Sequence, residues 1–137
     1  MANQLTQKRV AKATYSFAVD GGAVSTIQPQ TSDIIPSGAI ITNVIFDSKT
    51  ATTSGGAATV AITGGGLTLV AAQTIANNLL DGTLVSIMKA AGNTGSTSTA
   101  PYIVSKTTSA APIKVVVAVA ALTAGIFDVY VEYDYAD

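Results

Sequence analysis

Residues 35–62, IPSGAIITNVIFDSKTATTSGGAATVAI, contain two segments of strong strand character and only two charged side chains. Residues 39–49 are rich in β-branched side chains and are apolar on both faces as far as Asp47. This is typical of a central strand covered on both sides, or of one covered by a neighbouring subunit. Residues 57–63 alternate with the period of two expected of a strand. Residues 50–56 between them predict a loop, so the stretch predicts a pair of β-strands.

The pattern of strands and turns extends over the rest of the chain. Residues 9–19 alternate with period two, and the sequence DGG at residues 20–22 predicts a tight turn. A second glycine turn is predicted at residues 64–66, and residues 91–100 predict a mobile loop because they are small, polar and aperiodic. Further strands are predicted at residues 23–28, 83–90, 101–107, 112–122 and 126–135. A strand is also favoured at residues 67–76, where one turn of helix is the alternative.

About eight to ten strands joined in this way, without a convincing amphipathic helix, favour two packed antiparallel sheets. We therefore predict an all-β fold, an antiparallel β-sandwich that is jelly-roll-like and has about eight strands. An immunoglobulin-like sandwich is the alternative. At 137 residues the chain has the length of one domain. We expect an N-terminal arm at residues 1–12 and a single β-sandwich domain at residues 13–137.

The composition restricts the classes of function. The formal net charge is −1, which predicts no nucleic-acid or membrane partner. Cysteine and histidine are absent, which excludes disulfides, thiolate metal sites and the commonest general base. Charged residues make up 11% of the chain, against about 25% in ordinary soluble domains. Such a surface suits a subunit of a fixed assembly, and a secreted or thermally robust domain with a neutral surface is the alternative.

No segment of the sequence predicts secretion or membrane insertion. The charges at the N-terminus are not followed by an apolar core of signal-peptide length. The longest apolar run, at residues 115–122, is too short to span a bilayer.

The carboxylates do not predict a catalytic pair. Asp128 and Glu132 lie four residues apart on one strand face, about 13 Å by strand rise, which is too far for either glycosidase geometry. Asp128, Glu132 and Asp134 together could help hold calcium or pair with a basic partner, whereas a solvated outer face is the simpler interpretation. The glycine-rich TGGG lacks the lysine and helix of a P-loop. We predict no enzymatic activity, no cofactor and no metal.

Lys8, Arg9 and Lys12 form a small basic cluster near the N-terminus. They could belong to an arm that reaches an acidic neighbour, or to an ordinary frayed terminus. The last predicted strand is acidic, so pairing of the first strand with the last, in one subunit or between two, would place opposite charges across from each other. Exposed pairs of this kind contribute only about 0.2–1 kcal/mol each.

A resemblance to a known family is carried by several segments. These are IIPSGAIITNVIFDSKTATTSGGAATVAITGGG at residues 34–66, LVAAQTIAN at 69–77, LLDGT at 79–83 and TAGIFDVYVEY at 123–133. Together they resemble the small β-rich virion structural proteins of tailed bacteriophages, over roughly residues 15–135. The motifs are structural, and no catalytic residue carries over from the family.

The resemblance implies a capsid cement or decoration protein on the outer surface of the head shell. Proteins of this kind are commonly sandwiches and often trimers, so we expect the major capsid protein and a second and third copy of this chain as partners. A clamp that bridges capsomers gains affinity from several sites at once. The lack of cysteine fits assembly in a reducing host cytoplasm. A tail, baseplate or connector protein, or a glycan- or receptor-binding module on the particle, is the alternative.

Three segments are candidates for these contacts: residues 1–12, 50–56 and 91–100. We expect removal of residues 1–12 to weaken attachment to the capsid without unfolding the domain. The candidate contact residues for the capsid or for a neighbouring subunit are Lys8, Arg9, Lys12, Asn93, Thr94, Ser96, Asp128, Glu132 and Asp134.

Overall fold

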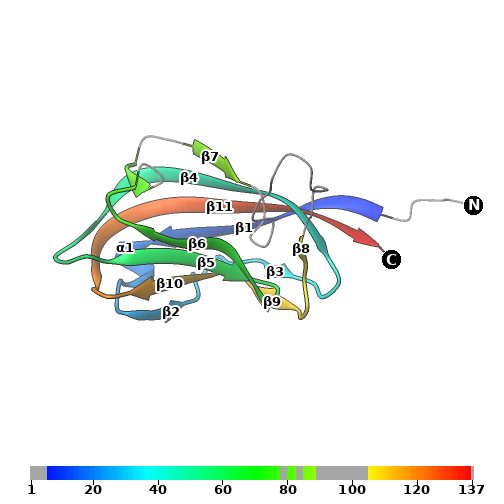
Figure 1. The fold of residues 1–137 in the computed structure, drawn as a ribbon, viewed down its shortest axis with the longest axis horizontal. Helices are drawn as coiled ribbons and strands as arrows, with labels where there is room; N and C mark the ends of the chain where they lie inside the picture. Colours follow the sequence, from blue (N-terminus) through cyan, green and yellow to red (C-terminus); the bar gives the residue numbers. More distant parts are fainter. Residues whose placement is uncertain (1–5, 78–79, 83–84, 89–104, 137) are drawn as a thin grey trace, which may run out of the picture.

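The strands of the chain lie in two main sheets that face each other (Figure 1). The structure, a computed structural model, describes residues 6–77, 80–82, 85–88 and 105–136. Sheet A has the order β1 (Thr6–Ser16), β11 (Leu122–Ala136), β4 (Ile40–Ser54) and β7 (Val85–Met88), and β8 (Ser105–Lys106) also pairs with β4. Sheet B has the order β2 (Ser25–Ile27), β10 (Lys114–Ala118), β5 (Thr59–Gly64) and β6 (Leu67–Thr74). A small third sheet joins β3 (Ile34–Ile35) to β9 (Ala111–Pro112).

The pairing of the strands is nested along the chain. β1 pairs with β11, β2 pairs with β10, β4 pairs with β7, and β5 pairs with β6, all antiparallel. The pairs β11–β4 and β10–β5 then join these units into the two sheets. A long hairpin folded into two layers gives this nesting of strand pairs. The all-β antiparallel sandwich predicted from the sequence is confirmed.

The core lies between the two sheets and is built from alternate residues of the long strands. Tyr15, Phe127 and Phe46 stack in a row across β1, β11 and β4, with ring centroids 4.8 Å and 4.6 Å apart. All three side chains are buried. Stacked aromatic pairs of this kind add about 0.5–1.5 kcal/mol each beyond their buried area. The aliphatic part of the core includes Ile41, Val44, Val60, Ile62, Val70, Val115, Val117, Val129 and Val131.

The first predicted strand is correct in its centre but wrong at its C-terminal end. β1 stops at Ser16, and Phe17–Asp20 form a single helical turn, α1. The Asp20 carboxylate accepts a hydrogen bond from the Ser16 N–H at 2.9 Å, and Gly21 follows with φ of +78°. This local hydrogen bonding is favoured over continuation of the strand, because it provides an acceptor for the Ser16 N–H where the chain leaves sheet A.

The expected loop at residues 50–56 is also wrong in part, because β4 continues to Ser54. β11 follows it through several register shifts, so the ladder persists although the sequence is small and polar. The Ser54 hydroxyl donates to the carbonyl of Ala121 at 2.6 Å and closes the end of the pair. Pairing with a long partner therefore overrides the local turn preference.

Other predicted strands are present with shifted ends or partners. The predicted strand at 112–122 is divided, because β10 ends at Ala118 and Val119 takes a positive φ of 72° where the chain crosses to sheet A. The predicted return strand, β2, pairs with β10 instead of returning along β1. The turn at residues 64–66 is confirmed, with Gly65 at φ +60° and Gly66 at φ +81°.

From Thr6 onward, the described part of the N-terminal segment belongs to sheet A. β1 begins at Thr6 and pairs with β11 as far as Ala136, so the expected boundary after residue 12 falls inside this strand. Removing residues 1–12 would take away more than half of β1. Such a deletion would therefore not separate attachment from folding.

Candidate interaction surfaces

The outer face of sheet A carries most of the charged residues that the sequence singled out. β1 and β11 pair in a register that places Lys8 opposite Asp134 and Lys12 opposite Tyr130. The Lys8 ammonium lies 3.8 Å from the Asp134 carboxylate. Of the alternatives left open by the sequence, the structure shows the pairing of the basic first strand with the acidic last strand, and this pairing occurs within one chain. We call this surface the charged face.

Asp128 lies at the centre of the charged face and differs from the other acidic residues. Its side chain is only 2% exposed, although it points to the outer side of the sheet. The Thr14 hydroxyl donates a hydrogen bond to it at 2.7 Å, and the Lys49 ammonium lies 2.9 Å away. The Lys12 ammonium is 3.9 Å away and also lies 5.3 Å from the centre of the Tyr130 ring. Asp128 thus links three neighbouring strands of sheet A, namely β1, β11 and β4.

A β-bulge places Lys49 over this carboxylate. Ile126 is opposite Thr50 and Phe127 is opposite Ser48, so Lys49 is an extra residue in β4. Bulges of this kind redirect a side chain without ending the ladder. The Lys49 side chain is half exposed, and its long stem covers Asp128.

The electrostatic balance keeps Asp128 ionised. Burial alone would raise the pKa of the Asp128 carboxyl, but hydrogen bonds from Thr14 and Lys49 and the charges of Lys12 and Lys49 together hold it below its ordinary value. The pKa of Lys49 is raised, first by its hydrogen bond to Asp128 and then by the charge of that carboxylate. The two groups therefore stabilise each other's charged forms.

The interpretation of Asp128 as part of a solvated outer face is wrong, since lysine and threonine side chains enclose it. Glu132 and Asp134 are partly exposed, as that interpretation expected, and the Asn43 amide donates to Glu132 at 2.9 Å. The positive charges of Lys12 and Lys49 beside Asp128 disfavour the binding of a metal ion there. Among the described residues no group of three acidic, cysteine or histidine side chains could hold a metal ion.

Arg9 is separated from the other candidate residues. Its neighbours Lys8 and Val10 point to the charged face, so Arg9 points to the opposite side of sheet A and lies 5.8 Å from the centre of the Tyr135 ring. Asn93, Thr94 and Ser96 lie outside the described residues. The structure therefore brings together Lys8, Lys12, Asp128, Glu132 and Asp134, and not the whole predicted set.

The outer face of sheet B is nearly free of charge. Lys114 is the one charged residue in its four strands. The register places Thr63 beside Lys114 on one side and beside Thr68 on the other. The half-buried outward residues of β5 and β10 are Thr59, Thr63, Lys114, Val116 and Ala118. We call this surface the neutral face.

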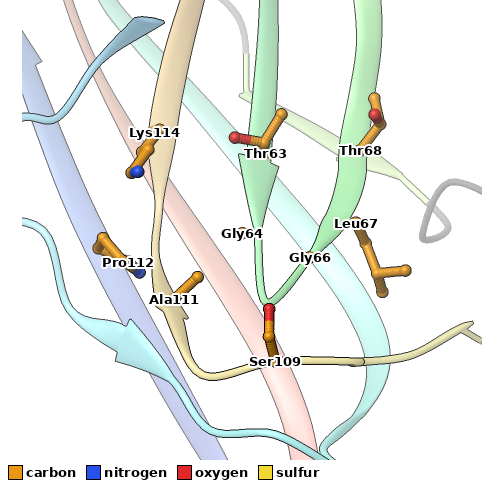
Figure 2. A pocket seen from close by; sticks show the side chains of 9 residues that line it. All are labelled: Thr63, Gly64, Gly66, Leu67, Thr68, Ser109, Ala111, Pro112 and Lys114. Atoms are coloured by element: carbon orange, nitrogen blue, oxygen red, sulfur yellow. The ribbon is translucent and has the colours of Figure 1, made fainter.

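A shallow cavity of about 280 Å³ lies at one end of the neutral face, beside the β5–β6 turn (Figure 2). Lys114, Thr63 and Ser109 surround it, and Figure 2 shows their polar atoms around the same opening. Lys114 forms no ion pair within the described part of the chain. The cavity therefore offers one ammonium group and several hydroxyl groups on a surface that otherwise has no charge.

Lys49, Thr14 and Lys114 belong to these surfaces, although they were not predicted from the sequence. Lys49 is one of only two charged residues in the segment 35–62, which was a usable signal. Its role depends on a register shift between β4 and β11 that no periodicity reveals. Thr14 and Lys114 reach their positions on these surfaces through pairing between strands that are distant in the sequence.

In the described part of the chain, no helix has the length and apolar character needed to cross a membrane.

Comparison with known proteins gives one structural likeness. No protein-family model and no curated protein matches the chain. A chain of the cyanophage Pam1 capsid asymmetric unit matches this fold with a TM-score of 0.57 and 15% sequence identity. The likeness covers 97% of this chain and 88% of that one. It shows a shared fold over almost the whole length of both chains.

Proposed function

We propose that this protein is a non-enzymatic structural component of a bacteriophage virion, and more narrowly a cement or decoration protein on the outer capsid surface. The observation that carries the proposal is the fold likeness to a chain of a phage capsid over 97% of the sequence. The virion-protein resemblance in the segments between residues 34 and 133 supports it independently. The partner would be the major capsid protein, and particles would assemble in the host cytoplasm.

The distribution of charge supports a role in protein contacts. On the charged face the ionic groups are used within the chain, because Asp128 is bound by Lys49 and Lys12 and Asp134 by Lys8. The neutral face can be covered by another protein with little desolvation of charge, which is the main penalty in burying polar surfaces. We propose that copies of this chain meet through the neutral face, in a trimer.

The decisive experiment for the proposed function is a binding assay on capsid shells of the virus that encodes the chain. Purified protein is added to empty shells, the shells are sedimented, and the bound protein is counted and located by electron cryomicroscopy. We expect saturable binding at symmetry-related positions on the outer surface. Absence of binding to these shells, together with density for the protein in the tail or baseplate of whole virions, would replace the cement role by the alternative.

The proposed trimer contact is tested separately by light scattering. Thr68→Glu adds a charge at an exposed position of the neutral face, and we expect it to shift the protein toward the monomer. Thr123→Glu makes the same change at an exposed threonine of sheet A outside the candidate contact segments and serves as the matched control. A wild-type protein that is monomeric at all concentrations, or equal effects of the two variants, would contradict the contact.

A further inference from the structure

β1 lies at an edge of sheet A, and one half of that edge is closed by hydrogen bonds. In the described part of the chain β1 pairs with β11 alone. The Lys12 N–H donates to the Asp33 carboxylate at 2.9 Å, and the Asp33 N–H donates to the Lys12 carbonyl at 2.9 Å. The Thr31 hydroxyl donates to the Thr14 carbonyl at 3.4 Å. Residues 12–16 are therefore covered on their free side by Thr31 and Asp33, which lie between β2 and β3, and by Asp20 of α1.

The other half of the same edge has no partner among the residues that the structure describes. In an antiparallel strand the N–H and C=O of one residue point to the same side, and alternate residues point to opposite sides. Because Lys12 directs its backbone groups away from β11, Val10, Lys8 and Thr6 do the same. No described residue hydrogen-bonds these groups on that side. The Val10 side chain is 53% exposed, which is unusual for a large aliphatic residue in a strand.

The other sheet edges are shorter or irregular. β2 has three residues and β7 has four. β6 is longer, but its pairing with β5 shifts register between Val60 and Ile62, and the Gln73 side chain donates to the carbonyl of Ala71 in its own strand. Proteins commonly protect an edge with such short strands, bulges and covering groups. The start of β1 is thus the longest regular edge left without such protection among the described strands.

We propose that the edge of residues 6–10 receives an extended segment of another protein, which adds a strand to sheet A beside β1. This inference rests on the proposed function, so the segment belongs to the capsid shell protein. Figure 1 shows that the start of β1 and the end of β11 lie at the same end of the molecule, so one added strand would extend the sheet there. Main-chain hydrogen bonds provide the affinity in this mode of recognition, and alternate side chains provide the specificity.

The side chains beside the open edge define the chemistry of the added strand. Lys8 is 59% exposed, and its contact with Asp134 is long at 3.8 Å, so its ammonium can turn toward a new carboxylate. An acidic residue beside Lys8 and an apolar residue beside Val10 would complement this edge. Cross-strand pairs of both kinds each contribute about 0.2–1 kcal/mol.

Charge argues against a second copy of β1 as the occupant. An antiparallel β1–β1 pair centred on Val10 would place Lys8 opposite Lys12 at two positions. A pair centred on Lys8 would place the two Lys8 side chains opposite each other. Like charges directly across a ladder are destabilising. The edge therefore favours an acidic strand of a different protein.

The test is the substitution Val10→Pro, with Val10→Thr as the matched control. Proline removes the N–H that the added strand would need, while the β1–β11 ladder does not use that group, and proline is tolerated on an edge. Threonine keeps both the N–H and the β-branched shape. In the shell-binding assay we expect Val10→Pro to weaken binding at least tenfold and Val10→Thr to change it less than twofold. Circular dichroism on both variants confirms that the fold is kept.

Hydrogen exchange on the wild-type protein covers the case in which Val10→Pro fails to fold. We expect the amides of Lys8 and Val10 to exchange rapidly in the free protein and to become protected on the shell. Shell binding without this protection, or equal binding by Val10→Pro, would overturn the edge contact while leaving the proposed function intact. Dimers in solution that Val10→Pro abolishes would overturn it in favour of self-pairing. Failure of the wild type to bind shells would overturn the proposed function itself.

Discussion

Replacing Asp128 by asparagine tests whether the buried carboxylate holds the strands of sheet A together. Asparagine keeps the shape and an oxygen acceptor for the Thr14 hydroxyl, but it removes the charge that Lys49 and Lys12 bind at 2.9 Å and 3.9 Å. Breaking a fully buried ion pair costs about 3–5 kcal/mol, and an exposed pair is worth about 0–1 kcal/mol. Asp128 is 2% exposed but its lysines are 52% and 46% exposed, so they can return to water. We therefore expect a loss of about 1–2 kcal/mol in the free energy of unfolding.

Thermal and urea unfolding at neutral pH measure this loss. For a domain of this size 1 kcal/mol corresponds to roughly 3–4 °C, so the expected decrease in Tm is about 3–8 °C. The pKa of Asp128 is lowered in the folded protein, so its contribution is present above the unfolded pKa and is lost as the pH falls through the folded value. The difference between wild type and Asp128→Asn should therefore shrink in acid.

Asp134→Asn is the matched control, because it removes the same charge from the same strand at a long and more exposed contact. We expect it to change the free energy of unfolding by less than about 0.5 kcal/mol. Equal effects of the two substitutions would refute the special role of Asp128. A loss for Asp128→Asn that stays constant down to strongly acidic pH would refute the electrostatic reasoning and indicate a packing effect.

Three further predictions concern other parts of the fold. Burial, assisted by the charge of Asp20, raises the pKa of Tyr15 to about 12. In a phenolate absorbance titration Tyr15 should therefore ionise near pH 12, and stability should fall above pH of about 10, where the unfolded chain ionises first. Thr52 has a buried hydroxyl with no hydrogen-bond partner among the described residues, so Thr52→Val should raise the free energy of unfolding by about 1 kcal/mol in urea titrations. Gly65→Ala should lower it by about 2 kcal/mol, because φ is positive and the new Cβ would meet the Thr107 side chain, whereas Gly55→Ala should be neutral or slightly stabilising.

The sequence was sufficient for features that depend on alternation along one strand. The inward positions of β5 and of β11 follow directly from period two, and the buried residues Val60, Ile62, Phe127 and Val131 confirm it. The pairing of β1 with β11 could also be anticipated, since opposite charges at matching intervals mark the two ends of the chain. These features need no knowledge of the rest of the fold.

Features that depend on a distant partner could not be read from the sequence. Thr50 to Ser54 are small and polar, and only the length of β11 keeps them in a strand. Asp128 shares its alternation with Glu132 and Asp134, yet it is buried because a bulge brings Lys49 over it and because Thr14 lies opposite. Burial on an outer face therefore depends on the side chains of adjacent strands, which no single-strand pattern contains.

The low charge of the chain has a more specific meaning once the sheets are known. The strands of sheet A contain Lys8, Arg9, Lys12, Asp47, Lys49, Lys106, Asp128, Glu132 and Asp134, while those of sheet B contain Lys114 alone. A neutral whole-chain composition could have come from sparse charges spread evenly, which would leave both faces alike. Instead the charges are concentrated in sheet A, where Lys8, Lys12, Lys49, Asp128 and Asp134 bind β1, β11 and β4 to one another. The opposite face is left able to be covered by protein with little desolvation of charge, and the open edge of β1 remains on the charged side, where an acidic strand would find Lys8.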